Sequence, residues 1–154
     1  MKHSSELFVD ASPEEVVEVL SDLSTYPAWN DLVASAEPVE RIDGDFGPAW
    51  STTLKAKVGP FSRSKQLRFV RDLFESDESV GKANICFSRR ELDGRNHASW
   101  KMECSVSGAT NDETAVTLTL TYDGGLWVPS LGTVLDGAIR RATTRLPAYV
   151  VAQQ

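Results

Sequence analysis

The side chains that could act as acids, bases or nucleophiles are few and widely spaced in this sequence. Histidine occurs only as His3 and His97, and His97 follows the Asp93-Gly94 turn closely enough to indicate a rim or surface position. No Ser/His/Asp, Cys/His or paired-carboxylate arrangement of the kind that catalysis requires stands out. Two widely separated histidines also cannot supply the ligands of a histidine-ligated iron centre. We therefore predict no catalytic residue, no metal ligand and no cofactor.

Two cysteines, Cys86 and Cys104, lie inside runs that alternate like strands. No CxxC or Cys/His spacing indicates zinc. We expect two buried free thiols rather than a disulfide. Among the carboxylates, Asp22 and Asp31 lie near predicted short helices, where they could approach a cavity entrance; both also suit the ends of helices.

Two arginines are candidates for binding an anionic group. Arg141 and Arg145 lie at the margin of an apolar stripe near the C-terminus, where a guanidinium could bind a ligand carboxylate or phosphate through two hydrogen bonds. The alternative is that both side chains extend into solvent. Together with Arg140 they could also form a basic patch for an acidic partner or anionic lipid, although Asp136 weakens that patch.

The composition is that of a globular chain with an acidic balance. The 154 residues are 41% hydrophobic and 25% charged, with a formal net charge of −6. This length suits a single domain, which we place at residues 1–154. The negative charge argues against nucleic-acid binding, because phosphate contacts require a surplus of lysine and arginine. Neither a signal peptide nor a membrane-spanning apolar run is visible, so we expect a cytoplasmic protein without stable membrane insertion.

Alternating apolar and polar residues predict strands from residue 35 onward. The runs lie near 36–42, 48–58, 62–74, 79–91, 96–108 and 113–123, between turns that include Asp43-Gly44, Gly59-Pro60, Ser76-Asp77, Asp93-Gly94 and Asn111-Asp112. Each strand has a single apolar face, which indicates an antiparallel sheet with one face on the core and the other exposed to solvent. Short connections indicate hairpins, so successive strands should be neighbours.

A strand and a helix precede this sheet region. Residues 4–11 read as a first strand, and the sequence SPEEVVEVLSD at residues 12–22 begins with a dense helix-start signal. Ser12 can cap the helix, and Glu15 completes a capping box with it.

A second short helix is predicted within residues 24–33, with Ser24 or Thr25 as its cap. This segment contains Tyr26 and Trp29, whose amphipathic rings can pack on a ligand while their polar atoms stay hydrogen-bonded. The same rings could instead fasten the helices to the sheet.

The last segment, residues 129–154, returns to a helical period. Its apolar stripe consists of Leu131, Leu135, Ala138, Ala142, Leu146 and Tyr149, flanked by Val134, Ile139 and Val150. This pattern predicts a long amphipathic helix. Pro147 cannot donate its backbone hydrogen bond, so we expect a bend or early fraying there.

This order of elements, together with the stretch FVDASPEEVVEVLSDLSTYPAWNDLV, resembles the START-like (SRPBCC) superfamily, the helix-grip group that includes the Bet v 1-type and polyketide cyclase/dehydrase families. The most specific part is the strand ending at Ala11, the SPEE helix start and the Asp22…Tyr26-Pro27-x-Trp29 stretch. The C-terminal YDGGLWVPSLGTVLDGAIRRATTRLPAYV is compatible with the family's last helix. The segment AKVGPFSRSKQLRF resembles the central hairpin of the CoxG-type branch.

The resemblance implies an α+β helix-grip fold, in which a seven-stranded curved antiparallel sheet wraps around a long C-terminal helix, with two short helices between strands 1 and 2. It also implies a cavity between the sheet and that helix. Members bind lipids, sterols, quinones, polyketides or plant hormones; some cyclise or dehydrate polyketides, and some act on partner proteins. Because one fold hosts many activities, the site must carry the functional argument.

We expect the cavity to bind or carry a small hydrophobic ligand of the lipid, isoprenoid, quinone or polyketide type. The alternatives are a polyketide cyclase/dehydratase-like enzyme and a protein- or membrane-interaction module with a patch near the Gly59-Pro60-Phe61 turn. The predicted ligand contacts are Tyr26, Trp29, Trp50, Phe69, Phe87, Trp100, Met102, Leu118, Leu135, Ile139, Ala142, Arg141 and Arg145. The apolar ones could equally form an ordinary core, and their pattern does not decide between the two roles. The identity of the ligand and the oligomeric state stay open.

Overall fold

The computed structural model describes residues 1–109, 113–125 and 129–154. Within them one antiparallel sheet has the strand order β1-β7-β6-β5-β4-β3-β2. The strands are β1 (Lys2–Val9), β2 (Val33–Val39), β3 (Ala49–Val58), β4 (Phe61–Asp77), β5 (Lys82–Arg89), β6 (Ser99–Gly108) and β7 (Thr114–Asp123). From β2 to β7, each strand pairs with its neighbour in sequence, as the short connections predict. The fold is the predicted α+β helix grip.

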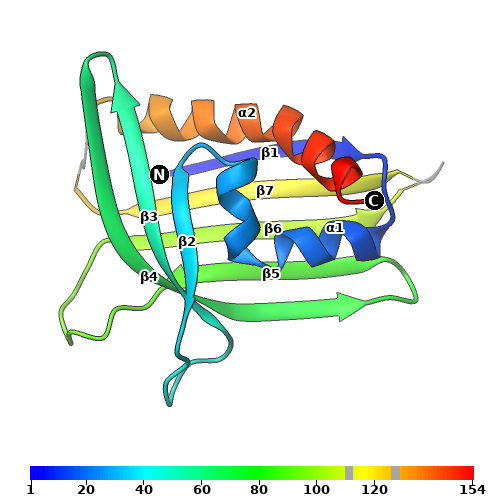
Figure 1. Ribbon diagram of the computed structural model, residues 1–154, viewed down its shortest axis with the longest axis horizontal. Helices are drawn as coiled ribbons and strands as arrows, with labels where there is room; N and C mark the ends of the chain where they lie inside the picture. Colours follow the sequence, from blue (N-terminus) through cyan, green and yellow to red (C-terminus); the bar gives the residue numbers. More distant parts are fainter. Residues whose placement is uncertain (110–112, 126–128) are drawn as a thin grey trace.

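In the part of the chain that the structure describes, three helices lie on one face of this sheet, and the core forms between the helices and the sheet. They are α1 (Pro13–Leu20), the 3-10 helix η1 (Leu23–Ala28) and α2 (Leu131–Ala152). Figure 1 shows α2 running along β1, next to β7, while α1 lies over β5 and β6. The stripe predicted for the last helix is buried in this core, except for half-buried Tyr149. No helix among the described residues is long and apolar enough to cross a membrane.

The caps of the two short helices differ in how well the sequence predicts them. The Ser12 hydroxyl accepts from the Glu15 N–H at 3.2 Å, and the Glu15 carboxylate accepts from the Ser12 N–H at 3.3 Å, so the capping box is confirmed. The prediction that Ser24 or Thr25 caps η1 is wrong. Asp22 is the cap, because its carboxylate lies two residues ahead of the Ser24 N–H and accepts it at 3.0 Å.

Two other local predictions are corrected. The predicted Ser76-Asp77 turn is the end of β4, and the chain reverses over residues 78–81, where Gly81 supplies a positive φ of 63°. Early fraying at Pro147 is also wrong, since α2 continues to Ala152. Leu146 and Val150 are buried on either side of the proline, and their packing holds the last turns in place. The predicted Asn111-Asp112 turn lies outside the described residues.

β3 and β4 each extend beyond a neighbouring strand, so that a stretch of each has no strand on one side. The β2–β3 pairing ends where Val33 meets Leu54, so residues 55–58 of β3 have no β2 strand beside them. The β3–β4 pairing ends where Ala49 meets Val70, so the last residues of β4 pair only with β5. A Cβ at Gly47 would lie 2.1 Å from the Arg71 carbonyl oxygen. Glycine therefore lets the chain approach β4 at the point where β3 begins.

Candidate functional site

The apolar and aromatic residues predicted to contact a ligand all lie in one buried cluster between the sheet and the helices. Each is at most 5% exposed: Tyr26, Trp29, Trp50, Phe69, Phe87, Trp100, Met102, Leu118, Leu135, Ile139 and Ala142. The structure thus brings these side chains together. Their role as ligand contacts stays a prediction.

Aromatic rings fill the part of this interior next to η1. The ring centroids of Tyr26 and Trp29 lie 4.3 Å apart, and the Tyr26 ring meets Phe87 edge-on at 5.6 Å. Phe87 in turn meets Trp50 edge-on at 5.4 Å. Such tilted and edge-to-face pairs are favourable arrangements beyond their buried area. This end of the grip is therefore packed with side chains.

The buried titratable groups in this interior are held in their neutral forms. The Tyr26 hydroxyl donates to the Leu20 carbonyl at 2.9 Å and lies 3.3 Å from the Cys104 sulfur. Burial raises the pKa of Tyr26 well above its ordinary value, and burial raises the pKa of the Cys104 thiol to about 12. Both cysteines are free and buried, as predicted. A thiol with a raised pKa is a poor nucleophile at neutral pH.

Thr52 is an interior residue that the sequence analysis missed. It is fully buried and alternates with Trp50 and Leu54 on the inner face of β3. Among the described residues its hydroxyl has no hydrogen-bond partner. An unpaired buried hydroxyl is costly, so a polar atom from elsewhere would be favourable next to it. The signal available in the sequence is a polar residue at an inward position between two large apolar ones.

A hollow lies beside this packed interior, at the free edge of β3. A groove of about 460 Å³, which we call the α2–β3 groove, lies between the first half of α2 and the free edge of β3. Its apolar walls come from Leu32, Val58, Val134 and Ala138. Its rim consists of Gly137 and the polar residues Asp31, Lys55, Lys57, Ser130, Thr133 and Arg141. A smaller hollow of about 110 Å³ shares Val58 and continues to Phe61 at the tip of the β3–β4 hairpin, where Phe61 is 67% exposed.

The free edge of β3 presents backbone groups to this groove. The N–H of Lys55 donates to the Leu32 carbonyl at 2.9 Å, on the side of β2. Alternate residues of a strand direct their N–H and C=O groups to the same side. The N–H and C=O of Lys57 therefore face that side too, beyond the point where β2 begins at Val33.

Both predicted arginines bind a single carboxylate at the mouth of the groove. Arg141 and Arg145 are half-exposed, and each donates a short hydrogen bond to Asp31, in the connection between η1 and β2. A Cβ at Gly137 would lie 3.1 Å from the Arg141 guanidinium, so glycine leaves room for that side chain along the helix. The arginines do not simply extend into solvent. They join α2 to the opposite wall of the groove through Asp31.

Basic side chains outnumber acidic ones around the α2–β3 groove. Lys55, Lys57 and Arg141 line it, with Asp31 as the one carboxylate among the described lining residues. Arg140, which the sequence grouped with these arginines, pairs instead with Asp136 one turn earlier on the helix. In a chain of net charge −6, this positive rim would favour an anion.

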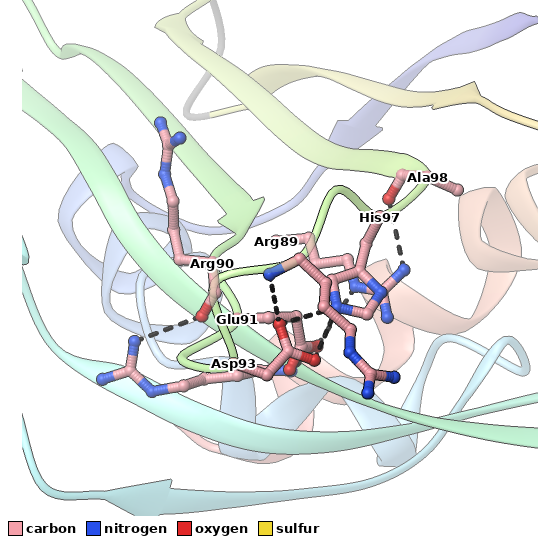
Figure 2. Close-up of polar contacts among 8 residues, drawn as sticks. Arg89, Arg90, Glu91, Asp93, His97 and Ala98 are labelled. Atoms are coloured by element: carbon pink, nitrogen blue, oxygen red, sulfur yellow. Dashed lines mark hydrogen bonds and ion pairs between the residues drawn. The ribbon is translucent and has the colours of Figure 1, made fainter.

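His97 lies at the surface, as predicted. Figure 2 shows it in the connection between β5 and β6, where its Nε2 lies 2.8 Å from an Asp93 carboxylate oxygen. In the same network Arg89 donates to Glu91 at 3.1 Å and to the Ala98 carbonyl at 3.2 Å. These contacts fix the loop, and none of them involves a residue that lines the α2–β3 groove.

Comparisons with known proteins agree with this architecture. The family model described as polyketide cyclase/dehydrase and lipid transport matches residues 2–151. No curated protein matches the chain. Among solved structures, a START superfamily protein from Mycobacterium smegmatis is similar over 99% of this chain and 99% of its own, at 17% identity and a TM-score of 0.73. Human StAR-related lipid transfer protein 5 is similar over 97% of this chain and 75% of its own, at 13% identity and a TM-score of 0.77. A STAR-related lipid transfer protein from Xanthomonas axonopodis matches 98% of this chain and 85% of its own fragment, at 18% identity and a TM-score of 0.65. These identities establish the fold alone.

Proposed function

The chain belongs to the polyketide cyclase/dehydrase and lipid transport family, and we propose that it binds or carries a small hydrophobic molecule with an anionic head in the α2–β3 groove. The observation that carries this proposal is a hollow with apolar walls and a basic rim, between α2 and the free edge of β3. Ligand sites typically combine apolar walls with a few polar groups that set orientation. Lipids, isoprenoids and polyketides with a carboxylate or phosphate fit this description.

The head of the ligand would bind at the rim. Arg141 and Arg145 already hold one carboxylate, that of Asp31, so their geometry suits a second anion of the same kind. The ligand would compete with Asp31 for the guanidinium groups, and the N–H of Lys57 would offer a further donor. The apolar tail would lie along Val58 and Val134 towards the buried interior.

Thr52 supports a polar contact deeper along β3. Its hydroxyl lies on the same face of the strand as Leu54 and Ala56, and Ala56 lines the hollow next to the groove. A ligand with an oxygen atom at its inner end would satisfy this hydroxyl. Quinone- and polyketide-type molecules carry such oxygen atoms.

Catalysis of the cyclase or dehydratase kind is less well supported. It requires an acid or base inside the cavity with a pKa suited to proton transfer. The phenol of Tyr26 and the thiol of Cys104 remain neutral because of burial, and Tyr26 already donates to the Leu20 carbonyl. Asp31 is occupied by two arginines. The geometry therefore favours binding over reaction.

The test compares two probes that differ only in the head, dodecanoate and dodecanol. Isothermal titration should show dodecanoate binding to the protein more tightly than dodecanol. In the double variant Arg141→Gln/Arg145→Gln, the affinity for dodecanoate should fall about 10-fold or more, since charge-assisted hydrogen bonds are lost. The affinity for dodecanol should stay nearly unchanged.

Arg140→Gln is the matched control, because Arg140 lies on the same helix but pairs with Asp136 outside the groove. It should bind both probes as the unaltered protein does. An equal loss of dodecanoate affinity in Arg140→Gln would show that the affinity depends on the overall charge of the helix rather than on this site. If neither probe binds, and neither raises the melting temperature, the proposed binding function is wrong.

A further inference from the structure

A larger groove, of about 630 Å³, lies at the other end of β4 and is not explained by the proposed function. We call it the α1–β4 groove. Its walls are α1 on one side and the β4–β5 hairpin on the other, with Pro13, Val17 and Phe74 as its apolar side chains. None of the residues that line the α2–β3 groove lines this one.

An unpaired sheet edge runs along this groove. After the bulge between Arg71 and Leu73, β4 pairs only with β5, through residues 73–77. Figure 1 shows this half of β4 as the lower border of the sheet, with no strand beyond it. Alternate N–H and C=O groups along the stretch therefore face outward. Such an edge is a template for pairing with another extended chain.

Phe74 gives the edge an apolar contact on the side of the helices. It pairs directly with Ile85, a core residue, so both side chains lie on the concave face of the sheet. The Arg71 guanidinium lies 4.5 Å from the centroid of the Phe74 ring and donates to the Ser21 carbonyl at the end of α1. Phe74 is still 41% exposed. The aliphatic stem of an incoming lysine or arginine could therefore pack on it.

The charge of the α1–β4 groove defines the occupant. Glu14, Glu18, Asp77 and Glu78 line it, with Lys82 as the one basic residue among the described lining residues. Glu14, Glu18 and Glu78 form no ion pair with any described residue. Four carboxylates along one groove attract a cationic partner and repel an anionic one.

We propose that the α1–β4 groove docks an extended basic segment of a partner protein, which adds to the edge of β4 as a further strand. Lysine or arginine side chains of the segment would lie on the concave face against Glu14, Glu18 and Glu78. The intervening apolar side chains point to the opposite face of the sheet, where they would pack on the 39% exposed Leu73. A second copy of this chain does not fit, because edge-to-edge pairing would bring the acidic residues of both copies together. An anionic membrane surface is repelled for the same reason.

The test uses a fluorescent short peptide that alternates lysine and valine, followed by anisotropy. Two peptides serve as controls: one with glutamate in place of lysine, and one of unchanged charge with proline in place of the central valines. The alternating peptide should bind best. The proline peptide should bind about 10-fold more weakly, because proline cannot donate to the strand ladder. On binding, the outward-facing amides within residues 73–77 should become protected from hydrogen exchange.

Protein variants locate the site. Glu14→Gln/Glu18→Gln should weaken binding of the alternating peptide about 5-fold or more through lost charge attraction, whereas Glu6→Gln/Glu37→Gln, which removes the same charge from exposed positions on β1 and β2, should not. If the proline peptide binds as tightly as the alternating peptide, the segment does not add to β4 as a strand. If Glu6→Gln/Glu37→Gln loses as much affinity as Glu14→Gln/Glu18→Gln, the peptide does not bind in the α1–β4 groove. Self-association of the protein through this edge, strengthened by Glu14→Gln/Glu18→Gln, would overturn the choice of partner.

Discussion

The α2–β3 groove and the α1–β4 groove arise from the same cause but carry opposite charge. Each lies where a strand continues past its neighbour: β3 beyond the start of β2, and β4 beyond the start of β3. The first has a rim of two lysines and an arginine against Asp31, and the second has four carboxylates against Lys82. β4 connects them, from Phe61 near one groove to Asp77 at the other.

This difference shows how one curved sheet can offer two separate binding places. The unequal strand lengths create the hollows, and the side chains around each hollow select what fits. The aromatic rings of Tyr26, Trp29 and Phe87 fill the interior between them. The two grooves should therefore respond separately to substitutions on their own walls, and together to damage in the shared core.

The largest effect should come from that shared core. Phe87→Ala removes a fully buried ring that contacts both Tyr26 and Trp50, and should lower the free energy of unfolding by about 3–5 kcal/mol. Urea unfolding measures this. Phe61→Ala, at an exposed ring, should change the stability by less than about 0.5 kcal/mol. If Phe87→Ala costs under about 1 kcal/mol, the interior between the grooves is not filled as described, by the same cavity argument.

The next effect concerns the loop that leads into β3. Asp45 accepts a hydrogen bond from the Arg68 guanidinium at 2.7 Å, and this bond lowers the pKa of the Asp45 carboxyl below its usual 3.8. Asp45→Asn should cost about 2–3 kcal/mol at neutral pH, because a charged hydrogen bond to a buried arginine is lost. Because the folded-state pKa is the lower one, the stabilisation is present above about pH 4 and disappears as the pH falls through the folded value.

Urea unfolding of the Asp45→Asn variant at pH 7 and at successively lower pH checks this sign. The difference from the unaltered protein should shrink on acidification. A difference that stays constant with pH would mean that the asparagine disturbs packing rather than the ion pair.

A large side chain placed in one groove should weaken binding there and leave binding in the other groove unchanged. Val134→Trp places a large ring in the α2–β3 groove and should weaken dodecanoate binding about 10-fold, or about 1.4 kcal/mol. Binding of the lysine-valine peptide should not change. Val17→Trp, in the wall of the α1–β4 groove, should give the reverse pattern. Titration of each variant with both probes measures the separation, and loss of both probes in either variant would contradict it.

The smallest effect concerns the carboxylate at the mouth of the α2–β3 groove. Asp31→Asn removes the carboxylate that competes for Arg141 and Arg145, so the affinity for dodecanoate should rise about 3-fold. The stability should fall by less than about 1 kcal/mol, since these ion pairs are exposed. Calorimetric titration and thermal unfolding give the two values. A lower affinity for dodecanoate would mean that Asp31 positions the arginines for the ligand instead of competing with it.

The sequence predicted the elements whose signals are local. The capping box at Ser12, the alternation of the strands and the stripe of the last helix all depend on neighbours within a few residues, and the structure bears them out. The resemblance to the START-like superfamily supplied the curvature and the position of α2. Local signals failed where two of them compete, as at Ser76-Asp77, where a turn-forming pair is held in β4 by pairing with β5.

The grooves could not be predicted in the same way, because they depend on contacts between distant residues. Arg141 was a candidate for an anion, but its partner Asp31 lies 110 residues earlier and was placed only near a possible entrance. The length of the free β4 edge follows from the close approach of Gly47 to Arg71. Thr52 looks like any other strand threonine until its neighbours show that its hydroxyl is buried and unpaired among the described residues.

An amide NMR titration with dodecanoate would show which groove binds the ligand. The α2–β3 groove predicts chemical-shift changes in residues 55–58 and 130–141, with little change in α1 (Pro13–Leu20). The same titration of Arg141→Gln/Arg145→Gln should need about 10-fold more ligand to reach the same shifts. Shifts concentrated in α1 and residues 73–78, or none at saturating dodecanoate, would contradict the assignment of the ligand to this groove.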